Sequence, residues 1–203
     1  MTLDKSNIII NIKGIICDFD GTIADTESIH DEAYLKALSE QNIYISSTKL
    51  ISKYEGKTGK RMLEDIQTEG NISFDIDRVL ERKIDIYNNM LDRVKMYPLV
   101  ESFLTLLKDK YKLAILTVSR LESIKISLSK LQIDDWFDVL ITSEDIEEGI
   151  KSSKIFLKTA KALNLKSEEC LVLENSAVAC TNAYKAGMKV IQADEGTLKW
   201  FEG

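Results

Sequence analysis

Residues 15–22 read IICDFDGT, an apolar run that ends in two carboxylates and then turns. An isoleucine-rich run of this kind predicts a buried strand of a parallel sheet. Ligands in open α/β sheets bind at the carboxyl ends of strands, so we expect Asp18 at a binding site and Asp20 within reach of it. Gly21 allows the tight bend that follows. An ordinary polar turn is the alternative, but the Asp-x-Asp-Gly-Thr combination favours a functional site.

The strand-and-helix pattern recurs downstream. Apolar strand candidates cover 112–116, 138–142, 170–173 and 189–193, and helical apolar spacing covers 121–131, 153–163 and 177–186. This alternation predicts right-handed crossovers and a parallel sheet. Gly187, just past the last helical pattern, is a plausible helix stop.

A different pattern separates the first strand from the rest. Residues 26–95 hold few strand candidates, and helical spacing runs from Thr26 through Leu38, over 60–67 and over 77–91. A helical insertion within an α/β core accounts for this, so we predict a core of residues 1–24 and 96–203 and a cap of residues 25–95. Tyr97-Pro98, which holds the only proline, marks the return to the core.

Composition limits the class of protein. Hydrophobic residues make up 44% and charged residues 30%, which is typical of a globular chain, and the net charge of −6 argues against a nucleic-acid partner. Cys17, Cys170 and Cys180 lie in apolar stretches without disulfide or zinc spacing, which favours buried thiols in a reducing cytoplasm. No stretch has the length of a membrane span or the pattern of a signal peptide, so no membrane partner is expected. Oligomeric state leaves no signal in this sequence.

Three further motifs follow the Asp18 segment in order. Thr117-Val118-Ser119 comes directly after the strand candidate at 112–116, and Glu174-Asn175 follow the strand candidate at 170–173. Between them, Lys151 lies in a loop. Together the four motifs resemble those of haloacid dehalogenase superfamily phosphatases with a helical cap after the first strand, the subgroup of β-phosphoglucomutase and phosphoglycolate phosphatase. The resemblance runs from about Lys13 to Ala193. It implies a Rossmann-like α/β core with a parallel sheet and an inserted helical cap.

The resemblance implies roles for the first motif. Asp18 matches the family nucleophile, which forms an aspartyl phosphate. Asp20 matches the general acid and base, and its backbone carbonyl would also bind the metal. Two close carboxylates need a cation, and Mg²⁺, a hard ion with oxygen ligands, is the natural cofactor. Gly21 and Thr22 are expected beside the substrate, where Thr22 would position Asp20 or cap the following helix.

The second and third motifs are expected to bind the phosphoryl group. Thr117 would donate a hydrogen bond to it, helped by backbone N–H groups of Val118 and Ser119 at the next helix start. Lys151 would neutralise its oxygens. The loop lacks both prolines of the family pattern, and its aromatic residue comes one position early, so Lys154 is a competing candidate for this lysine.

The fourth motif departs from the family at one position. Asn175 falls where relatives commonly have a metal-binding aspartate. Its amide oxygen can ligate Mg²⁺ but adds no negative charge, so a weaker metal site is expected. Glu174 is a direct or water-mediated metal ligand in the same interpretation. The alternative is that Asn175 or Ser176 only caps the next helix.

The cap offers fewer candidates. His30, the only histidine, lies where some mutase relatives have one near the substrate, although a structural role is equally plausible. Residues 56–61 resemble the substrate-specificity loop, with Gly56 and Lys57 as candidate contacts. Gly59 occupies the position where β-phosphoglucomutases typically have an arginine, which weakens the mutase interpretation. Lys60 and Arg61 would otherwise form a solvated basic turn.

These observations favour one function. We expect a Mg²⁺-dependent phosphatase that hydrolyses a small phosphorylated metabolite through an aspartyl phosphate. A hexose-phosphate mutase of the β-phosphoglucomutase type is the first alternative. A catalytically weak binding protein with the same fold is the second, because position 175 and the lysine loop are both altered.

Overall fold

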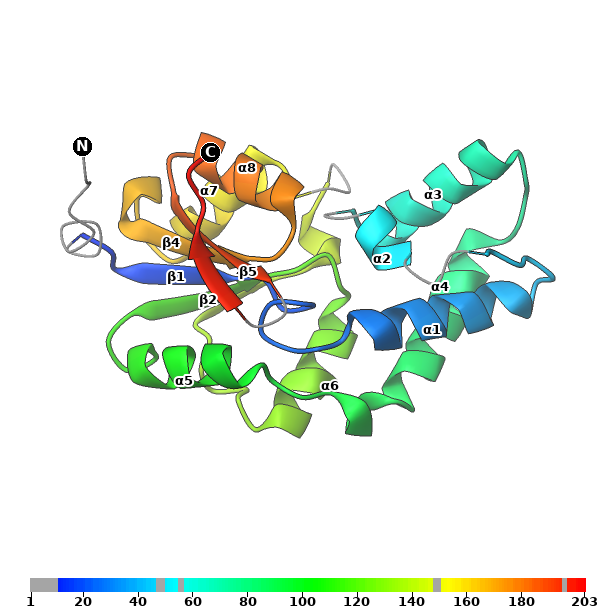
Figure 1. The fold of residues 1–203 in the computed structure, drawn as a ribbon, viewed down its shortest axis with the longest axis horizontal. Coiled ribbons are helices and arrows are strands. Elements are labelled where there is room, and N and C mark those ends of the chain that lie inside the picture. The colour runs from blue at the N-terminus through cyan, green and yellow to red at the C-terminus, as the bar shows by residue number, and fades with distance from the viewer. Residues whose placement is uncertain (1–10, 47–49, 55–56, 148–150, 195–196) are drawn as a thin grey trace.

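The computed structural model describes residues 11–46, 50–54, 57–147, 151–194 and 197–203 (Figure 1). Six strands form one sheet in the order β3-β2-β1-β4-β5-β6. The strands are β1 (Gly14–Cys17), β2 (Lys112–Leu116), β3 (Val139–Ile141), β4 (Cys170–Glu174), β5 (Lys189–Asp194) and β6 (Thr197–Trp200). Strands β1 to β5 are parallel, as predicted, but β6 pairs antiparallel with β5. This edge strand was not predicted, because the predicted strand series ends at residue 193.

The central strand β1 is buried on both faces. Its alternate residues enter two hydrophobic clusters, with Ile15 and Cys17 in one and Ile16 in the other. Helices α5 (Pro98–Leu107) and α6 (Leu121–Leu131) cover one face of the sheet, and α7 (Ser153–Ala162) and α8 (Ala177–Lys185) cover the other (Figure 1). Burial on both faces explains why β1 reads as a continuous apolar run rather than an alternating one.

Local signals set several helix ends. Pro98 stands at the first position of α5, where its missing N–H costs nothing. Ser176 caps α8, because its hydroxyl accepts a hydrogen bond from the Ala179 N–H at 3.3 Å. Gly187 has a φ of 82° just past α8, so the predicted helix stop is confirmed. Helix α5 was not predicted, although its proline marks where the chain returns to the sheet.

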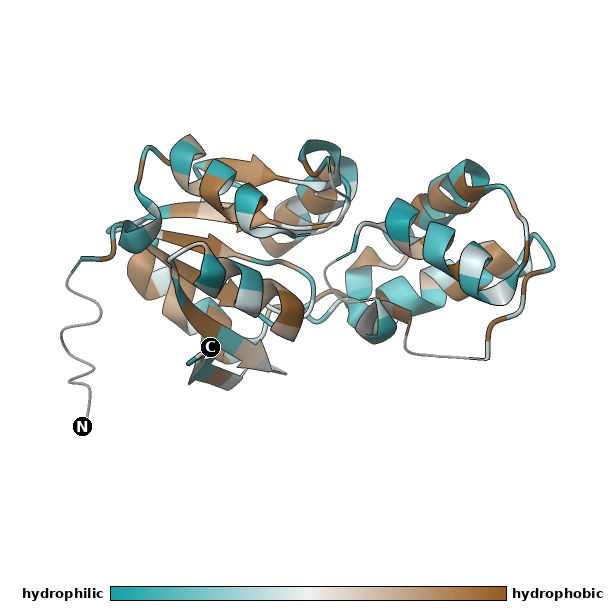
Figure 2. Ribbon diagram, turned by 90° about the horizontal axis from the view of Figure 1, so that it is seen from above, coloured by the Kyte–Doolittle hydropathy of each residue, from teal (hydrophilic) through white to brown (hydrophobic). Residues whose placement is uncertain are grey.

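A second group of helices lies beyond the carboxyl ends of the strands (Figure 2). It contains α1 (Glu27–Ser39), α2 (Leu50–Lys53), α3 (Gly59–Gly70), α4 (Ile76–Asn88) and a 3₁₀ turn at Leu91–Arg93. The predicted helices between 26 and 91 are therefore confirmed. The exact limits of a cap domain stay a prediction.

The two chain segments that join the helical group to the sheet are tied together. The Asp25 N–H donates to the Lys95 carbonyl at 2.9 Å, and the Tyr97 N–H donates to the Ile23 carbonyl at 3.0 Å. An isolated bridge also pairs Ala24 with Met96. Both connections therefore leave the sheet side by side, next to the end of β1.

The cysteines and the lengths of the helices bear on two further predictions. Cys17, Cys170 and Cys180 are free and buried, and burial raises the pKa of each thiol. This agrees with their interpretation as small buried hydrophobes. Within the described residues, no helix has the length and apolar character needed to cross a membrane.

The packing of α5 gives a test of the fold. Leu104 is fully buried against the sheet, whereas Leu106 on the same helix is 70% exposed. Leu104→Ala should lower the free energy of unfolding by about 2–5 kcal/mol, because it leaves a cavity in the core. Leu106→Ala is the matched control and should change it by less than about 0.5 kcal/mol. Urea denaturation of both variants measures the difference, and equal effects would contradict the assigned orientation of α5.

Candidate active site

The strand order places the functional motifs at one point. Strand β1 lies between β2 and β4, and the helices that follow β2 and β4 cover opposite faces of the sheet (Figure 1). Such a switch point leaves a crevice at the carboxyl ends of the strands. Asp18 follows β1, Thr117 follows β2 and Glu174 ends β4. Residues that are far apart in sequence thus meet at the edge where the sequence analysis expected a site.

Asp18, Lys151 and Glu174 form a buried charged cluster. The Lys151 ammonium donates to Asp18 Oδ1 at 2.5 Å and to Glu174 Oε2 at 2.7 Å. All three side chains are at most 5% exposed. Burial and the nearby Glu174 charge raise the pKa of Asp18, and Lys151 opposes this rise. Burial alone would lower the pKa of Lys151, but the two carboxylates outweigh it and raise that pKa. Lys151 therefore stays a cation and favours the ionised form of Asp18.

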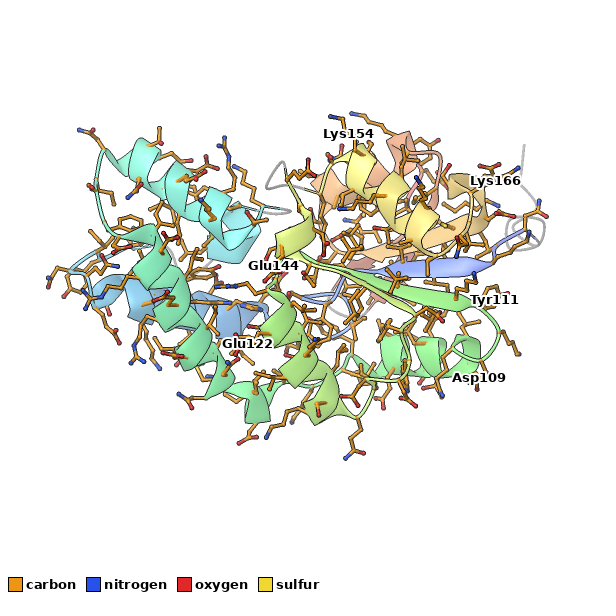
Figure 3. The ribbon with its side chains drawn as sticks, turned by 180° about the vertical axis from the view of Figure 1, so that it is seen from behind. Asp109, Tyr111, Glu122, Glu144, Lys154 and Lys166 are labelled. Atoms are coloured by element: carbon orange, nitrogen blue, oxygen red, sulfur yellow. The ribbon has the colours of Figure 1, made fainter. Side chains whose placement is uncertain are left out.

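The structure separates the two lysines that competed for this place. Lys154 is exposed on α7 (Figure 3). Lys151 is instead buried against Asp18. Asn182 of α8 supports the loop by donating from Nδ2 to the Lys151 carbonyl at 2.9 Å. The missing prolines therefore do not displace Lys151, because a neighbouring helix holds the loop.

Asp20 is held by four donors. Its Oδ1 accepts hydrogen bonds from Thr26 at 2.6 Å and His30 at 2.7 Å, and its Oδ2 accepts from Ser119 at 2.6 Å and Thr117 at 3.2 Å. Burial raises the pKa of Asp20, but the His30 charge and the hydrogen bonds outweigh burial and hold that pKa below its usual range. Asp20 is thus ionised in this conformation. It must leave some of these donors before it can hold a proton.

His30 connects Asp20 to the helical group. Its ring stacks on Tyr87 with centroids 4.2 Å apart. Burial and the Lys83 charge lower the pKa of His30, and Asp20 opposes that shift. Either the neutral or the protonated ring can donate its Nε2 hydrogen to Asp20. His30 is thus buried and hydrogen-bonded to Asp20, and its predicted position near the substrate stays a prediction.

Lys83 is a site residue that the sequence analysis missed. It is buried on α4, with its ammonium 5.0 Å from the Tyr34 ring centre and 4.7 Å from that of Tyr87. Burial lowers its pKa to about 8. A lysine in an amphipathic helix normally lies on the solvent face, so only the packing of α4 against α1 shows that this one faces the site.

Thr22 is fully buried and contacts Asp18 rather than Asp20. Its hydroxyl is 3.3 Å from Asp18 Oδ2 and 3.3 Å from Asn175 Oδ1. The expectation that Thr22 positions Asp20 or caps the next helix was wrong. Thr26 instead donates to Asp20 and occupies the N-cap position of α1, which begins at Glu27, without a capping hydrogen bond from its side chain. The intervening turn at residues 21–23 and the Ala24 bridge move the helix start to Glu27, five residues beyond Thr22.

Gly21 supports the same region. Its φ of 78° favours glycine, and a Cβ there would clash with the side chains of Asn175 and Glu27. Asn175 donates from Nδ2 to Glu27 Oε1 at 2.7 Å. The glycine therefore permits the turn and the close approach of these two side chains.

Backbone N–H groups complete a possible phosphate cradle. In the described part of the chain, the N–H groups of Phe19, Asp20 and Val118 have no acceptor. The Ser119 N–H instead donates to Thr117 Oγ1 at 3.0 Å. Unpaired N–H groups need partners, so those of Phe19 and Asp20, just after Asp18, and that of Val118, just after β2, favour an anionic ligand at these strand ends.

The oxygen atoms near Asp18 fit a cation. One Thr22 hydroxyl hydrogen faces both Asp18 Oδ2 and Asn175 Oδ1, so it can satisfy only one of them. No cluster of three or more His, Cys, Asp or Glu side chains could hold a metal in the described residues. The candidate oxygen ligands are therefore the Asp18 carboxylate, the Asn175 amide oxygen and the Asp20 backbone carbonyl. Glu174 is used differently, because its oxygens face Lys151 and the Ser176 N–H.

A cavity of about 580 Å³ opens between Asp20 and the helical group. His30, Lys83, Val118 and Ser119 line it, as do residues 57–62. Figure 3 shows Glu144 at the end of the sheet layer that faces the helical group. Lys57 is paired with Asp65 at 2.6 Å, and Gly56 lies outside the described residues. The predicted specificity loop thus borders the cavity.

The comparisons with known proteins agree with this geometry. The sequence model of the haloacid dehalogenase-like hydrolases matches residues 15–193, so the chain belongs to this family of enzymes. It is similar to a phosphorylated carbohydrates phosphatase of Thermotoga maritima, with 26% identity over 89% of this chain and 84% of the relative. It is also similar to the fructose-1-phosphate phosphatase YqaB of Escherichia coli, with 24% identity over 88% and 94% of the two chains.

A solved structure matches the fold at similar identity. The chain resembles the β-phosphoglucomutase of Clostridium difficile with a TM-score of 0.80 and 26% identity, covering 90% of this chain and 84% of that one. The predicted α/β fold and family are therefore confirmed. The relatives include both phosphatases and a mutase, so the type of reaction must be argued from the site.

The charged cluster predicts a pH-dependent loss of stability. Lys151→Met removes the cation between two buried carboxylates and should cost about 3–5 kcal/mol at neutral pH. In the variant the pKa of Asp18 rises further above its unfolded value, so protonation relieves the cost. The deficit should therefore shrink as pH falls from about 7.5 to about 5. Urea denaturation across this range tests it, with Lys154→Met as the exposed control; a deficit independent of pH would contradict the assignment.

Proposed function

We propose that the protein is a Mg²⁺-dependent phosphatase in which Asp18 is the nucleophile. The observation that supports this most is the placement of Asp18 just after β1, against Lys151, with the unpaired N–H groups of Phe19 and Asp20 following it in the chain. Lys151 and the N–H groups of Asp20 and Val118 would bind the phosphoryl oxygens of the substrate. Thr117 would donate its hydroxyl to the same group once Asp20 moves away.

The reaction would proceed in two displacements. An Asp18 oxygen attacks phosphorus, the bond to the leaving oxygen breaks, and Asp20 donates a proton to that oxygen. Water then attacks the phosphorus of the aspartyl phosphate, Asp20 takes the proton, and the Asp18 carboxylate is released with inorganic phosphate. Because Asp20 is held ionised here, it would act as an acid only after rotating away from Thr26 and His30.

Asp18, Asn175 and the Asp20 carbonyl would hold Mg²⁺, with Glu174 supporting Lys151. When bound, Mg²⁺ would screen the charge of the phosphate from Asp18 and stabilise the developing charge. The two acceptor oxygens that share the Thr22 hydroxyl support this placement. The cluster of Asp18, Glu174 and one lysine also carries excess negative charge, which a cation would offset.

We further propose a small phosphorylated carbohydrate as substrate. Two relatives are named for phosphorylated carbohydrates and fructose 1-phosphate. The cavity between Asp20 and the helical group would hold the leaving group, and residues 25–95 would act as the cap that excludes water. The paired connections at Asp25–Lys95 and Ile23–Tyr97 would be the hinge.

A mutase is the second candidate, and one observation favours it. His30 contacts Asp20, which fits a histidine near a sugar substrate. Gly59 speaks against it, because a Cβ at this position would overlap the Tyr34 hydroxyl. An arginine, typical of β-phosphoglucomutases here, would require the Tyr34 side chain to move. Hydrolysis is therefore the better supported reaction.

Removal of the nucleophile tests the mechanism. Asp18→Asn should lower Mg²⁺-dependent hydrolysis of p-nitrophenyl phosphate by about 10³-fold or more, because the amide cannot form the aspartyl intermediate. Asp25→Asn, in the same segment but exposed, is the control and should retain activity. Circular dichroism checks that both variants fold. Near-normal turnover by the folded Asp18→Asn protein would exclude Asp18 as nucleophile.

A product analysis distinguishes phosphatase from mutase. With β-glucose 1-phosphate, time-resolved ³¹P NMR should show inorganic phosphate as the product. Glucose 6-phosphate appearing first would instead establish mutase activity. A panel of sugar and polyol phosphates measured by phosphate release should then identify the preferred leaving group, with p-nitrophenyl phosphate as the reference.

A further inference from the structure

We propose that Glu27 is a positioning residue that fixes the Asn175 amide as an oxygen ligand for the metal. Glu27 Oε1 accepts a hydrogen bond from Asn175 Nδ2 at 2.7 Å. A carboxylate only accepts, so it selects the amide orientation with nitrogen toward Glu27 and oxygen toward Asp18 and Thr22. This inference rests on the proposed Mg²⁺-dependent function.

The local backbone supports this pairing. Glu27 is the first residue of α1, and Asn175 lies between the end of β4 and the cap of α8. Gly21 brings these two segments together, because a side chain at this position would clash with both partners. The Asn175 oxygen then lies 3.3 Å from the Thr22 hydroxyl, which also faces Asp18 Oδ2. Each atom of the amide therefore has a defined neighbour.

The pairing explains how this chain uses an asparagine where relatives have an aspartate. With aspartate at 175, a carboxylate oxygen would replace the amide nitrogen and face Glu27 at hydrogen-bond distance without a proton. Like charges this close repel, particularly in a partly buried site. Asn175→Asp alone should therefore not improve the metal site, although it adds a charged ligand. The benefit should appear only when Glu27 also becomes a hydrogen-bond donor, as in Glu27→Gln.

A double-mutant cycle without metal tests the pairing itself. In EDTA at pH 7.5, Asn175→Asp should lower the melting temperature by about 2–4 °C. Adding Glu27→Gln should restore most of this loss, because the Gln amide donates to the new carboxylate. Glu32→Gln, another charge-neutralising change on α1, is the control and should not rescue Asn175→Asp. Equal shifts with and without Glu27→Gln would overturn the proposed pairing.

Calorimetric titration with MgCl₂ tests its consequence. Glu27→Ala should weaken Mg²⁺ binding about tenfold, because the amide loses its fixed orientation. Glu27→Gln/Asn175→Asp should bind Mg²⁺ at least about tenfold more tightly than Asn175→Asp alone. If Asn175→Asp alone bound Mg²⁺ as tightly as the double variant, while the wild-type chain still bound Mg²⁺, only the positioning role of Glu27 would be overturned. No Mg²⁺ binding by the wild-type chain would overturn the proposed metal-dependent function as well.

Discussion

The Asp18 carboxylate, buried at the carboxyl end of a central strand, sets the requirements for everything around it. A charge in this position needs partners, and the structure supplies the Lys151 ammonium at 2.5 Å and the Thr22 hydroxyl. Lys151 in turn forms a second ion pair with Glu174, and Asn182 donates a hydrogen bond to its backbone carbonyl. The ends of β1 and β4, the loop before α7 and helix α8 are thus linked by one electrostatic constraint.

Asp20, the second carboxylate after β1, is held by neutral and histidine donors instead of a lysine. Asp20 leaves the strand direction and meets donors from both parts of the chain, Thr26 and His30 on one side and Thr117 and Ser119 on the other. It therefore bridges the sheet and the helical group. Any rotation of Asp20 would therefore break hydrogen bonds to His30 of α1 or to the segment that follows β2.

Much of this arrangement follows from local sequence signals. The boundaries of β2 and α6 agree with the predicted 112–116 and 121–131, because apolar periodicity and flanking polar residues define them. The meeting of Asp18, Thr117 and Glu174 also follows, since parallel strand ends share one edge of the sheet. Helix α5 and strand β6 were missed: α5 lies in a stretch assigned only as the return to the core, and β6 depends on pairing with β5.

The sequence by itself determined the fold class, the family and the identity of the central acidic residues, because these depend on periodicity and short motifs. Only the tertiary structure decided which lysine contacts Asp18, why Thr22 serves Asp18 rather than Asp20, and that Lys83 faces the site. It also revealed the pairing of Glu27 with Asn175, which are 148 residues apart. Contacts between distant segments depend on how the strands are ordered and how the loops between them fold, and no local pattern encodes either.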